Sequence, residues 1–188
     1  MKSGKLSEIY ASTITFNGRN NVFSVGDNTR IHNSDISISG NQNKVIIGND
    51  GWINGLQLII EDDNNTIVIG DGIFIFGNTR IYCVQGSNVN IEEGCMLSDQ
   101  IEIRTTDNHS IIDKISGKRI NFEEDVILHK HVWVGTHVIL LKGTEIPEGS
   151  IVGAGTICTK KYDIANSVIA GNPGKVIREN IEWKMPRI

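Results

Sequence analysis

The strongest constraint on the fold of this chain is a repeat of 22 residues in its first half. Four apolar residues end similar short segments at this spacing: Val25, Ile47, Ile69 and Ile91. Polar residues four positions earlier keep the same period, namely Asn21, Asn43, Asn65 and Ser87. A fixed period of this length indicates a solenoid, in which each copy is one circuit of the chain stacked on the previous circuit.

The second half of the chain has a shorter period, of six residues. Apolar residues recur at this step at seven successive positions: Phe122, Leu128, Val134, Leu140, Ile146, Val152 and Cys158. Six residues match neither the period of a helix nor the alternation of one long strand. They fit a short strand and a turn with one inward side chain, so that three such units close a triangular coil of 18 residues. The 22-residue repeat is then the same coil with four extra residues at one corner.

Composition favours coils of short strands over helices. The chain has 32 Ile and 13 Val but only 7 Leu, together with 20 Gly and 19 Asn. β-Branched residues favour strands, and Gly and Asn favour tight turns. The aromatic content of 6% suits a narrow core. We therefore predict an all-β fold, a parallel β-helix, in which backbone groups pair between stacked coils, and we exclude a helix bundle.

Charge and hydropathy exclude several classes of protein. A net charge of −4 and a pI near 5.7 argue against a nucleic-acid-coating protein. No apolar run reaches the roughly 18 residues of a membrane span, and the first twenty residues lack the hydrophobic stretch of a signal peptide. Three cysteines without a CxxC motif fit a reducing compartment. We expect a cytoplasmic protein without nucleic-acid partners, and not a secreted array such as an ice-binding protein.

A loop at residues 104–121 interrupts the six-residue pattern and is the first candidate for a catalytic site. Loops of this length in a compact repeat often carry function. His109 in this loop is a candidate general base, because an imidazole accepts a hydroxyl proton at neutral pH. Asp107 has two interpretations that the sequence leaves open: it orients the His109 ring, or it caps a turn.

Three motifs resemble the hexapeptide-repeat acyltransferases. They are His131-Val-Trp-Val-Gly135, Gly153-Ala-Gly-Thr-Ile-Cys-Thr-Lys160 and Ala170-Gly-Asn-Pro-Gly-Lys-Val-Ile-Arg178. The stretches at 64–71 and 103–110 are similar, more narrowly, to sugar O-acetyltransferases of capsule and polysialic acid clusters. This resemblance implies a left-handed β-helix, a homotrimer, and acetyl-CoA as the acetyl donor. The left hand is unusual for parallel crossovers, and the period alone does not predict it.

The resemblance also implies roles for residues outside the loop. Trp133 lies between two inward residues, so alternation turns its ring outward, and the resemblance pairs it with His109. Thr136, Gly153, Ala154 and Thr159 are expected to line a pantetheine channel. Lys160, Lys175 and Arg178 are expected to meet the phosphates of coenzyme A. Residues 156–188 carry six basic and three acidic residues, in agreement with an anionic ligand.

We therefore predict an O-acetyltransferase that moves an acetyl group directly from acetyl-CoA to a sugar hydroxyl of a surface polysaccharide or its precursor, without an acyl-enzyme. Cys158 falls in the core pattern and is interpreted as a small hydrophobe. The alternatives are an N-acetyltransferase acting on an amino sugar, a serine acetyltransferase, or a γ-class carbonic-anhydrase-like zinc protein using His129, His131 and His137. We expect no metal, because no converging ligand set accompanies these histidines.

The predicted organisation is a β-helix catalytic domain at residues 1–172, followed by a short C-terminal helix or arm at 173–188. Trp183 in this polar tail needs a partner, either on its own chain or on a neighbouring subunit. The three flat faces of the predicted prism allow copies to pack along their length in closed threefold symmetry.

Overall fold

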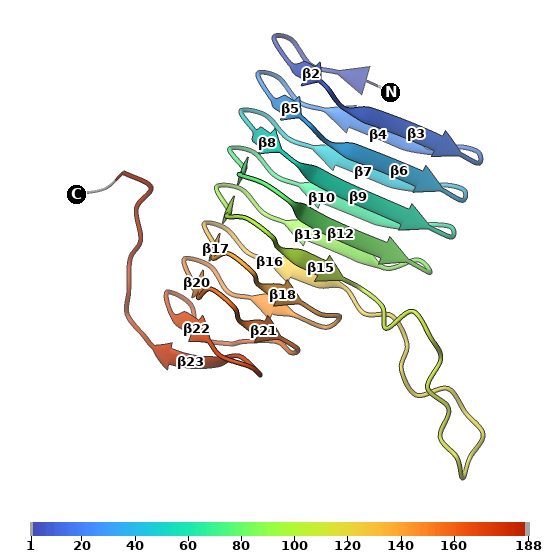
Figure 1. The fold of residues 1–188 in the computed structure, drawn as a ribbon, viewed down its shortest axis with the longest axis vertical. Helices are drawn as coiled ribbons and strands as arrows, with labels where there is room; N and C mark the ends of the chain where they lie inside the picture. The colour runs from blue at the N-terminus through green and yellow to red at the C-terminus, as the bar shows by residue number, and fades with distance from the viewer. Residues whose placement is uncertain (1, 187–188) are drawn as a thin grey trace.

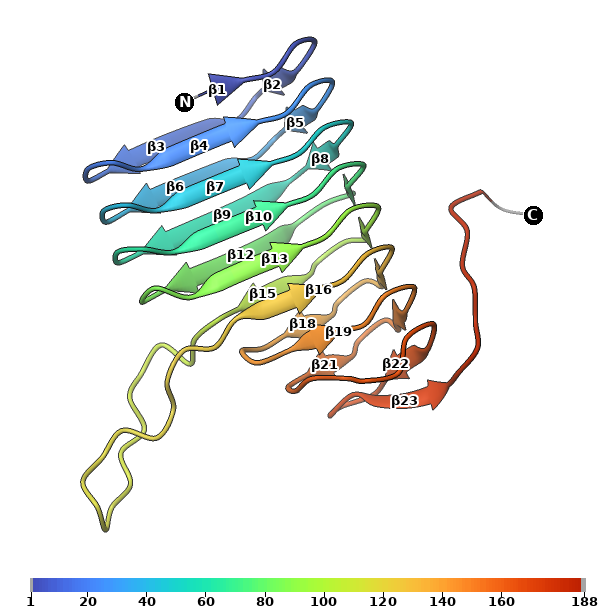
Figure 2. The same ribbon diagram turned by 180° about the vertical axis from the view of Figure 1, so that it is seen from behind.

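The computed structural model describes residues 2–186 and shows a three-sided column of stacked coils. The predicted domain bounds 1–172 and 173–188 include Met1, Arg187 and Ile188, which lie outside the described residues. From Lys2 to Cys158, each coil contributes one short strand to each of three sheets, here called sheets A, B and C, and the strands are parallel over this range. In both Figure 1 and Figure 2 the nearer strands run from left to right while the chain descends from the N-terminus, which makes the β-helix left-handed.

The three sheets contain all the described strands. Sheet A has the order β1 (Lys2–Ser3), β4 (Val22–Val25), β7 (Lys44–Ile47), β10 (Thr66–Ile69), β13 (Asn88–Ile91), β16 (Val126–Leu128) and β19 (Glu145–Ile146). Sheet B has the order β2 (Glu8–Tyr10), β5 (Arg30–His32), β8 (Trp52–Asn54), β11 (Phe74–Ile75), β14 (Met96–Leu97), β17 (Trp133–Val134), β20 (Ile151–Val152), β22 (Val168–Ala170) and β23 (Lys175–Arg178). Sheet C has the order β3 (Thr13–Asn17), β6 (Asp35–Ser39), β9 (Leu56–Glu61), β12 (Thr79–Val84), β15 (Glu102–Arg104), β18 (Ile139–Leu140) and β21 (Ile157–Cys158).

The strand registers confirm the 22-residue repeat. Val25 pairs with Ile47, Ile47 with Ile69, and Ile69 with Ile91. All four side chains are buried in one continuous core. Because each strand directs every second side chain inward, the core is a column of Ile, Val and Leu.

The six-residue ladder is confirmed from Leu128 to Cys158, where every member is buried. The prediction that Phe122 belongs to this ladder is wrong, because its side chain is 61% exposed. The strand pattern resumes only at Val126, which begins the next coil and pairs with Val89 in the coil before it. Phe122 therefore belongs to the inserted loop, which spans residues 105–125 and is longer than the predicted 104–121.

Buried asparagines hold one corner of the column. Asn43 and Asn65 are fully buried, and the side-chain oxygen of Asn43 accepts hydrogen bonds from the backbone N–H of Asn65 at 2.9 Å and from its side chain at 3.0 Å. The Asn43 side chain donates to the carbonyl of Asp62 at 2.9 Å. These bonds satisfy polar groups that would otherwise be costly to bury, which explains the 22-residue period of asparagine.

The C-terminal segment is an arm. The predicted alternative of a helix is wrong, because β23 pairs antiparallel with β22 and an extended segment follows it. The arm then rises along the face of sheet B, on the side of the column away from the inserted loop (Figure 2). Nowhere in residues 2–186 is there a helix long and apolar enough to cross a membrane.

Candidate active site

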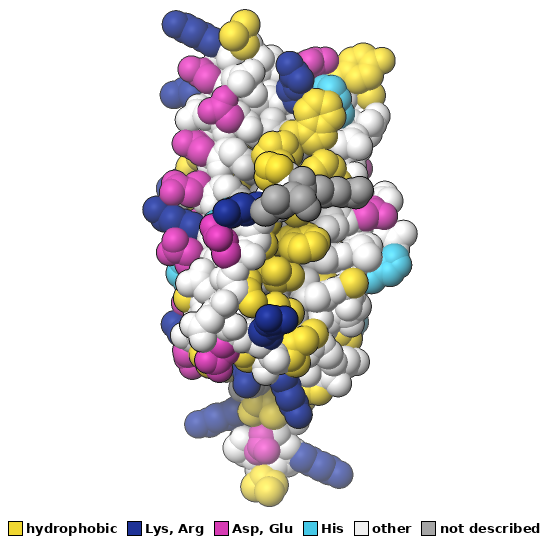
Figure 3. All heavy atoms as spheres, turned by 90° about the vertical axis from the view of Figure 1, so that its left-hand side faces the viewer, with side chains coloured by type: hydrophobic (Ala, Val, Ile, Leu, Met, Phe, Trp, Pro, Cys, Tyr) yellow, Lys and Arg dark blue, Asp and Glu magenta, His cyan; other side chains and the backbone are white. Residues whose placement is uncertain are grey.

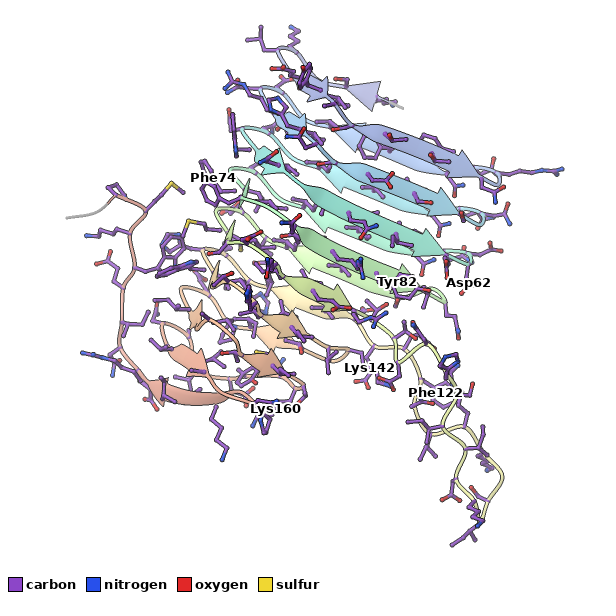
Figure 4. The ribbon with its side chains drawn as sticks, in the orientation of Figure 1. Asp62, Phe74, Tyr82, Phe122, Lys142 and Lys160 are labelled. Carbon is purple, nitrogen blue, oxygen red and sulfur yellow. The ribbon has the colours of Figure 1, made fainter. Side chains whose placement is uncertain are left out.

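The inserted loop leaves the column at the corner between sheets C and A, here called the C–A corner (Figure 1). Its base is fixed by Asp107, whose carboxylate forms a salt bridge of 2.6 Å with the ammonium of Lys142 and accepts a hydrogen bond of 2.9 Å from Asn121. Lys142 also donates to the carbonyl of Phe122 at 3.0 Å, and Figure 4 shows Lys142 and Phe122 side by side. The bonds from Lys142 and Asn121 hold the pKa of Asp107 below its ordinary value.

His109 is exposed on this anchored segment. Its backbone N–H donates to the carbonyl of Asp107 at 2.8 Å, and its carbonyl accepts a hydrogen bond of 2.9 Å from Asn121. The backbone around His109 is thus held on both sides while the imidazole faces outward. The Asp107 carboxylate is bound to Lys142 and Asn121, so within this chain it fixes the loop.

Trp133 lies in β17 on the outer face of sheet B, as the alternation predicts. Its neighbours in the ladder are Met96 and Ile151, and its indole N–H donates to the Ser98 hydroxyl at 3.2 Å. Its ring is half-buried and lies 6.0 Å from the Trp183 ring.

Trp183 finds its partner on its own chain. Its ring stacks on His131 with centroids 4.1 Å apart. Its indole N–H donates to the His131 carbonyl at 2.9 Å, and the Trp183 carbonyl lies 3.1 Å from the His131 ring nitrogen Nε2. These contacts dock the arm on sheet B beside Trp133.

His109 and Trp133 lie on different sides of one chain. The loop extends from the C–A corner, whereas β17 belongs to sheet B, the face opposite that corner (Figure 1). A single copy therefore does not bring these two predicted site residues together.

Thr136, Gly153 and Ala154 gather where the chain turns from sheet B to sheet C. The backbone N–H of Gly155 donates to the Thr136 carbonyl at 2.9 Å, which places the two turns in adjacent coils. A side chain at Gly135 would meet the backbone nitrogen of Ala154 at 2.8 Å, so a glycine is needed for this close approach. The result is an exposed edge of small residues.

A basic cavity of about 250 Å³ lies at the C-terminal end of the column. Lys160 and Lys175 line it together with Lys161 and Tyr162, and the ammonium of Lys160 lies 5.5 Å from the centre of the Tyr162 ring. Thr159 is exposed in the turn before Lys160, and Arg178 is exposed at the end of β23. The structure thus brings together two of the three predicted phosphate contacts, while Arg178 does not line the cavity.

The other histidines have separate surroundings. His129 lies between two carboxylates, 3.1 Å from Glu92 and 2.9 Å from Glu145, whereas His137 lies 3.4 Å from the Thr136 hydroxyl. Within residues 2–186, no group of three or more His, Cys, Asp or Glu side chains is arranged to hold a metal ion. Cys158 is fully buried, and burial raises the pKa of its thiol to about 11.

The sequence does not predict several residues of the candidate site. Lys142, Asn121, Ser98 and Tyr162 reach the site through folding and carry no motif of their own. The one feature in the sequence that could have indicated them is the positive charge of Lys142, one coil after the loop. Its partner Asp107 lies 35 positions earlier, and the two become neighbours only when their coils stack.

Comparison with known proteins identifies similar acetyltransferases. No protein-family model matches the chain. It is 38% identical over 96 residues to a polysialic acid O-acetyltransferase of Escherichia coli O1:K1 / APEC, a match that covers 51% of this chain and 31% of that protein. The chain spans between about a third and a half of the length of the first curated relatives it matches.

Two solved structures match almost the whole chain. The polysialic-acid-specific acetyltransferase NeuO is 31% identical with a TM-score of 0.76, and the match covers 94% of this chain and 90% of that chain. The polysialic acid O-acetyltransferase OatWY is 29% identical with a TM-score of 0.80, and the match covers 100% of this chain and 93% of that chain.

Proposed function

This chain belongs to the hexapeptide-repeat acetyltransferase family that includes the polysialic acid O-acetyltransferases, and from this premise we propose that it transfers an acetyl group from acetyl-CoA to a hydroxyl of a sugar in a surface polysaccharide. The observation that carries the proposal is the placement of His109. Its imidazole faces outward from a loop whose base is fixed by Asp107, Lys142 and Asn121. An anchored base on a protruding loop is suited to a bound acceptor, since geometry decides proton transfer.

The proposed reaction is a direct transfer with both substrates bound. His109 accepts the proton of the sugar hydroxyl while the hydroxyl oxygen attacks the thioester carbonyl. A backbone N–H or the indole N–H of Trp133 stabilises the negative charge on the carbonyl oxygen. The carbon–sulfur bond then breaks, and the thiolate of coenzyme A takes the proton from His109. The buried Cys158 thiol takes no part in this reaction.

The proposed donor site combines the edge of small residues with the basic cavity. Thr136, Gly153, Ala154 and Thr159 are proposed to contact the pantetheine arm, whose amides can bond to exposed backbone groups. Lys160 and Lys175 are proposed to bind the phosphates in the cavity, and Arg178 to add charge beside it. The proposal includes a cytoplasmic location, where coenzyme A thioesters are available and the three buried cysteines stay reduced.

The proposed active form is a homotrimer with its sites between chains. This proposal is supported by the separation of His109 from Trp133 within one chain. It is also supported by an apolar column on the outer face of sheet B, formed by Trp52, Phe74, Met96 and Trp133 in register. Figure 3 shows hydrophobic side chains gathered along this face. A closed ring of three copies would cover such a column and place a loop beside a neighbouring face.

The test is thiol release from acetyl-CoA across a panel of capsular glycans, nucleotide sugars and amino acids. We expect turnover with a glycan, with polysialic acid as the first acceptor because of the relatives. His109→Ala is expected to lower kcat by at least about a hundredfold, the typical contribution of a general base, with the oligomer unchanged. Lys118→Ala is the control, because Lys118 is exposed on the same loop as His109. Retained turnover in His109→Ala would remove the base assignment.

A further inference from the structure

A polar hollow of about 540 Å³ lies along the C–A corner in the N-terminal half of the column. Five residues line it: Asn20, Gln42, Lys44, Asn64 and Thr66. We call this hollow the corner groove. Asn20, Gln42 and Asn64 occupy equivalent turn positions in three successive coils, each with a positive φ of 59–64°. Their amide groups are therefore spaced by about 4.8 Å, the distance between neighbouring strands.

The fold does not use the side chains of the corner groove. Within residues 2–186, none of the five forms a hydrogen bond or an ion pair through its side chain with another described residue. Their sequence neighbours differ in this respect. The carboxylate of Asp63 accepts a hydrogen bond from the Asn41 backbone, and the buried Asn43 and Asn65 hold the interior of the same corner. The amides, hydroxyl and ammonium of the groove are left available to a ligand.

The corner groove leads to the loop that carries His109. One coil further along this corner, the Gln85 side chain accepts a hydrogen bond of 3.1 Å from Arg119 in the loop. Arg119 in turn bonds to Glu123 at 2.6 Å at the base of the loop. Figure 4 shows Asp62 at the same corner, directly above the loop that contains Phe122. An extended molecule lying along the corner would thus reach from the groove to the loop.

We propose that the corner groove binds sugar units of a polymeric acceptor that lie beyond the unit being acetylated. This inference rests on the proposed function and specifies its acceptor as a polymer. Amide side chains both donate and accept hydrogen bonds, as sugar hydroxyls require, and a repeated spacing suits a repeating ligand. The ammonium of Lys44 adds attraction for the carboxylates of an acidic glycan.

The test compares a long and a short acceptor in the full-length protein. The groove variant is Lys44→Ala/Gln42→Gly/Asn64→Gly, since glycine removes each amide and tolerates the positive φ. The matched control is Lys5→Ala/Asn28→Gly. It removes an exposed lysine and a turn amide at φ 54° from the corner between sheets A and B. The acceptors are polysialic acid and a sialic acid dimer, and KM and kcat are measured by thiol release.

We expect the groove variant to raise KM for polysialic acid by about tenfold, which corresponds to a loss of about 1.4 kcal/mol. KM for the dimer and kcat for both acceptors should stay unchanged, and the control should behave as wild type. Lys44→Glu changes none of the turn residues with positive φ and should also raise KM for the polymer.

Three other results would overturn the inference. An unchanged KM for polysialic acid, or an equal rise for polymer and dimer, would exclude a distal glycan site in the groove while leaving the proposed reaction in place. A wild-type protein that acetylates neither acceptor but accepts a nucleotide sugar would overturn both the polymeric acceptor and the groove. Absence of thiol release with every acceptor in the panel would overturn the proposed function itself.

Discussion

At the scale of single residues, the candidate site depends on one salt bridge that crosses two coils. Lys142 lies on the body of the column, and its ammonium binds both the Asp107 carboxylate and the Phe122 carbonyl. It therefore ties both ends of the loop to the coil below. Because the Lys142 side chain is only 15% exposed, this contact is better shielded from solvent than most surface ion pairs.

Lys142→Met tests this positioning role. Methionine keeps most of the apolar stem but removes both contacts, so we expect kcat to fall by about tenfold, the cost of a loosened catalytic group, with little change in KM for acetyl-CoA or in Tm. Lys142→Arg should restore part of kcat by renewing the salt bridge. Lys130→Met is the control, because Lys130 pairs with Glu93 on the exposed surface. A fall in Tm with kcat per folded protein unchanged would contradict the role.

At the scale of elements, a second cluster joins three successive strands of sheet A. His129 follows β16 and bridges Glu92, after β13, to Glu145 in β19. Lys161 bonds to Glu145 at 2.8 Å, and Lys130 bonds to Glu93 beside the cluster. The hydrogen bond to Glu145, then that to Glu92, raises the pKa of His129, while His129 and Lys161 lower the pKa of Glu145.

These shifts predict a pH-dependent contribution to stability. The raised pKa of His129 means that its protonated ring stabilises the fold. This stabilisation is complete below the ordinary pKa of 6.5 and is lost as pH rises through the raised pKa. The lowered pKa of Glu145 means that its carboxylate stabilises the fold above the ordinary pKa of 4.5. This contribution is lost as pH falls through the lowered pKa. We expect the Tm difference between wild type and His129→Gln to be largest between about pH 5 and 6.5 and to shrink by pH 9. A Tm difference that is constant with pH would contradict the prediction.

The sequence predicts the regular elements well, since each coil repeats the same local pattern. Val25, Ile47 and Ile69 stack as the period requires. Phe122 shows the limit of this reasoning. It keeps the six-residue step and is nonetheless exposed, because a period does not show where an inserted loop rejoins the column. The pairing of Asp107 with Lys142 rather than with His109 is also invisible in sequence, since it depends on which coils become neighbours.

At the scale of the whole molecule, the two main catalytic candidates lie on different sides of the column. His109 is on the loop at the C–A corner and Trp133 is on sheet B. The arm, held by Trp183, lies beside Trp133 on its own chain. In the proposed trimer, the loop of one copy meets the sheet B face of the next, so each site needs one residue from each of two copies.

Mixing of variants tests this shared site. His109→Ala and Trp133→Ala are each expected to form inactive trimers. When equal amounts are unfolded and refolded together, an active interface forms wherever an intact loop meets an intact Trp133. Random closed assembly gives about one quarter of all interfaces this combination. Thiol release should therefore recover to about a quarter of the wild-type value.

The control mixes His109→Ala with the double variant His109→Ala/Trp133→Ala, which offers no intact loop and should stay inactive. Mass spectrometry of the mixed trimers confirms that chains have exchanged. Exchange without recovered activity would place His109 and Trp133 in the same site of one chain, or remove one of them from the chemistry. Recovery near one quarter would instead mean that each chain folds as a complete column but is active only in contact with a second copy. One copy would supply His109 to the site and the other would supply Trp133.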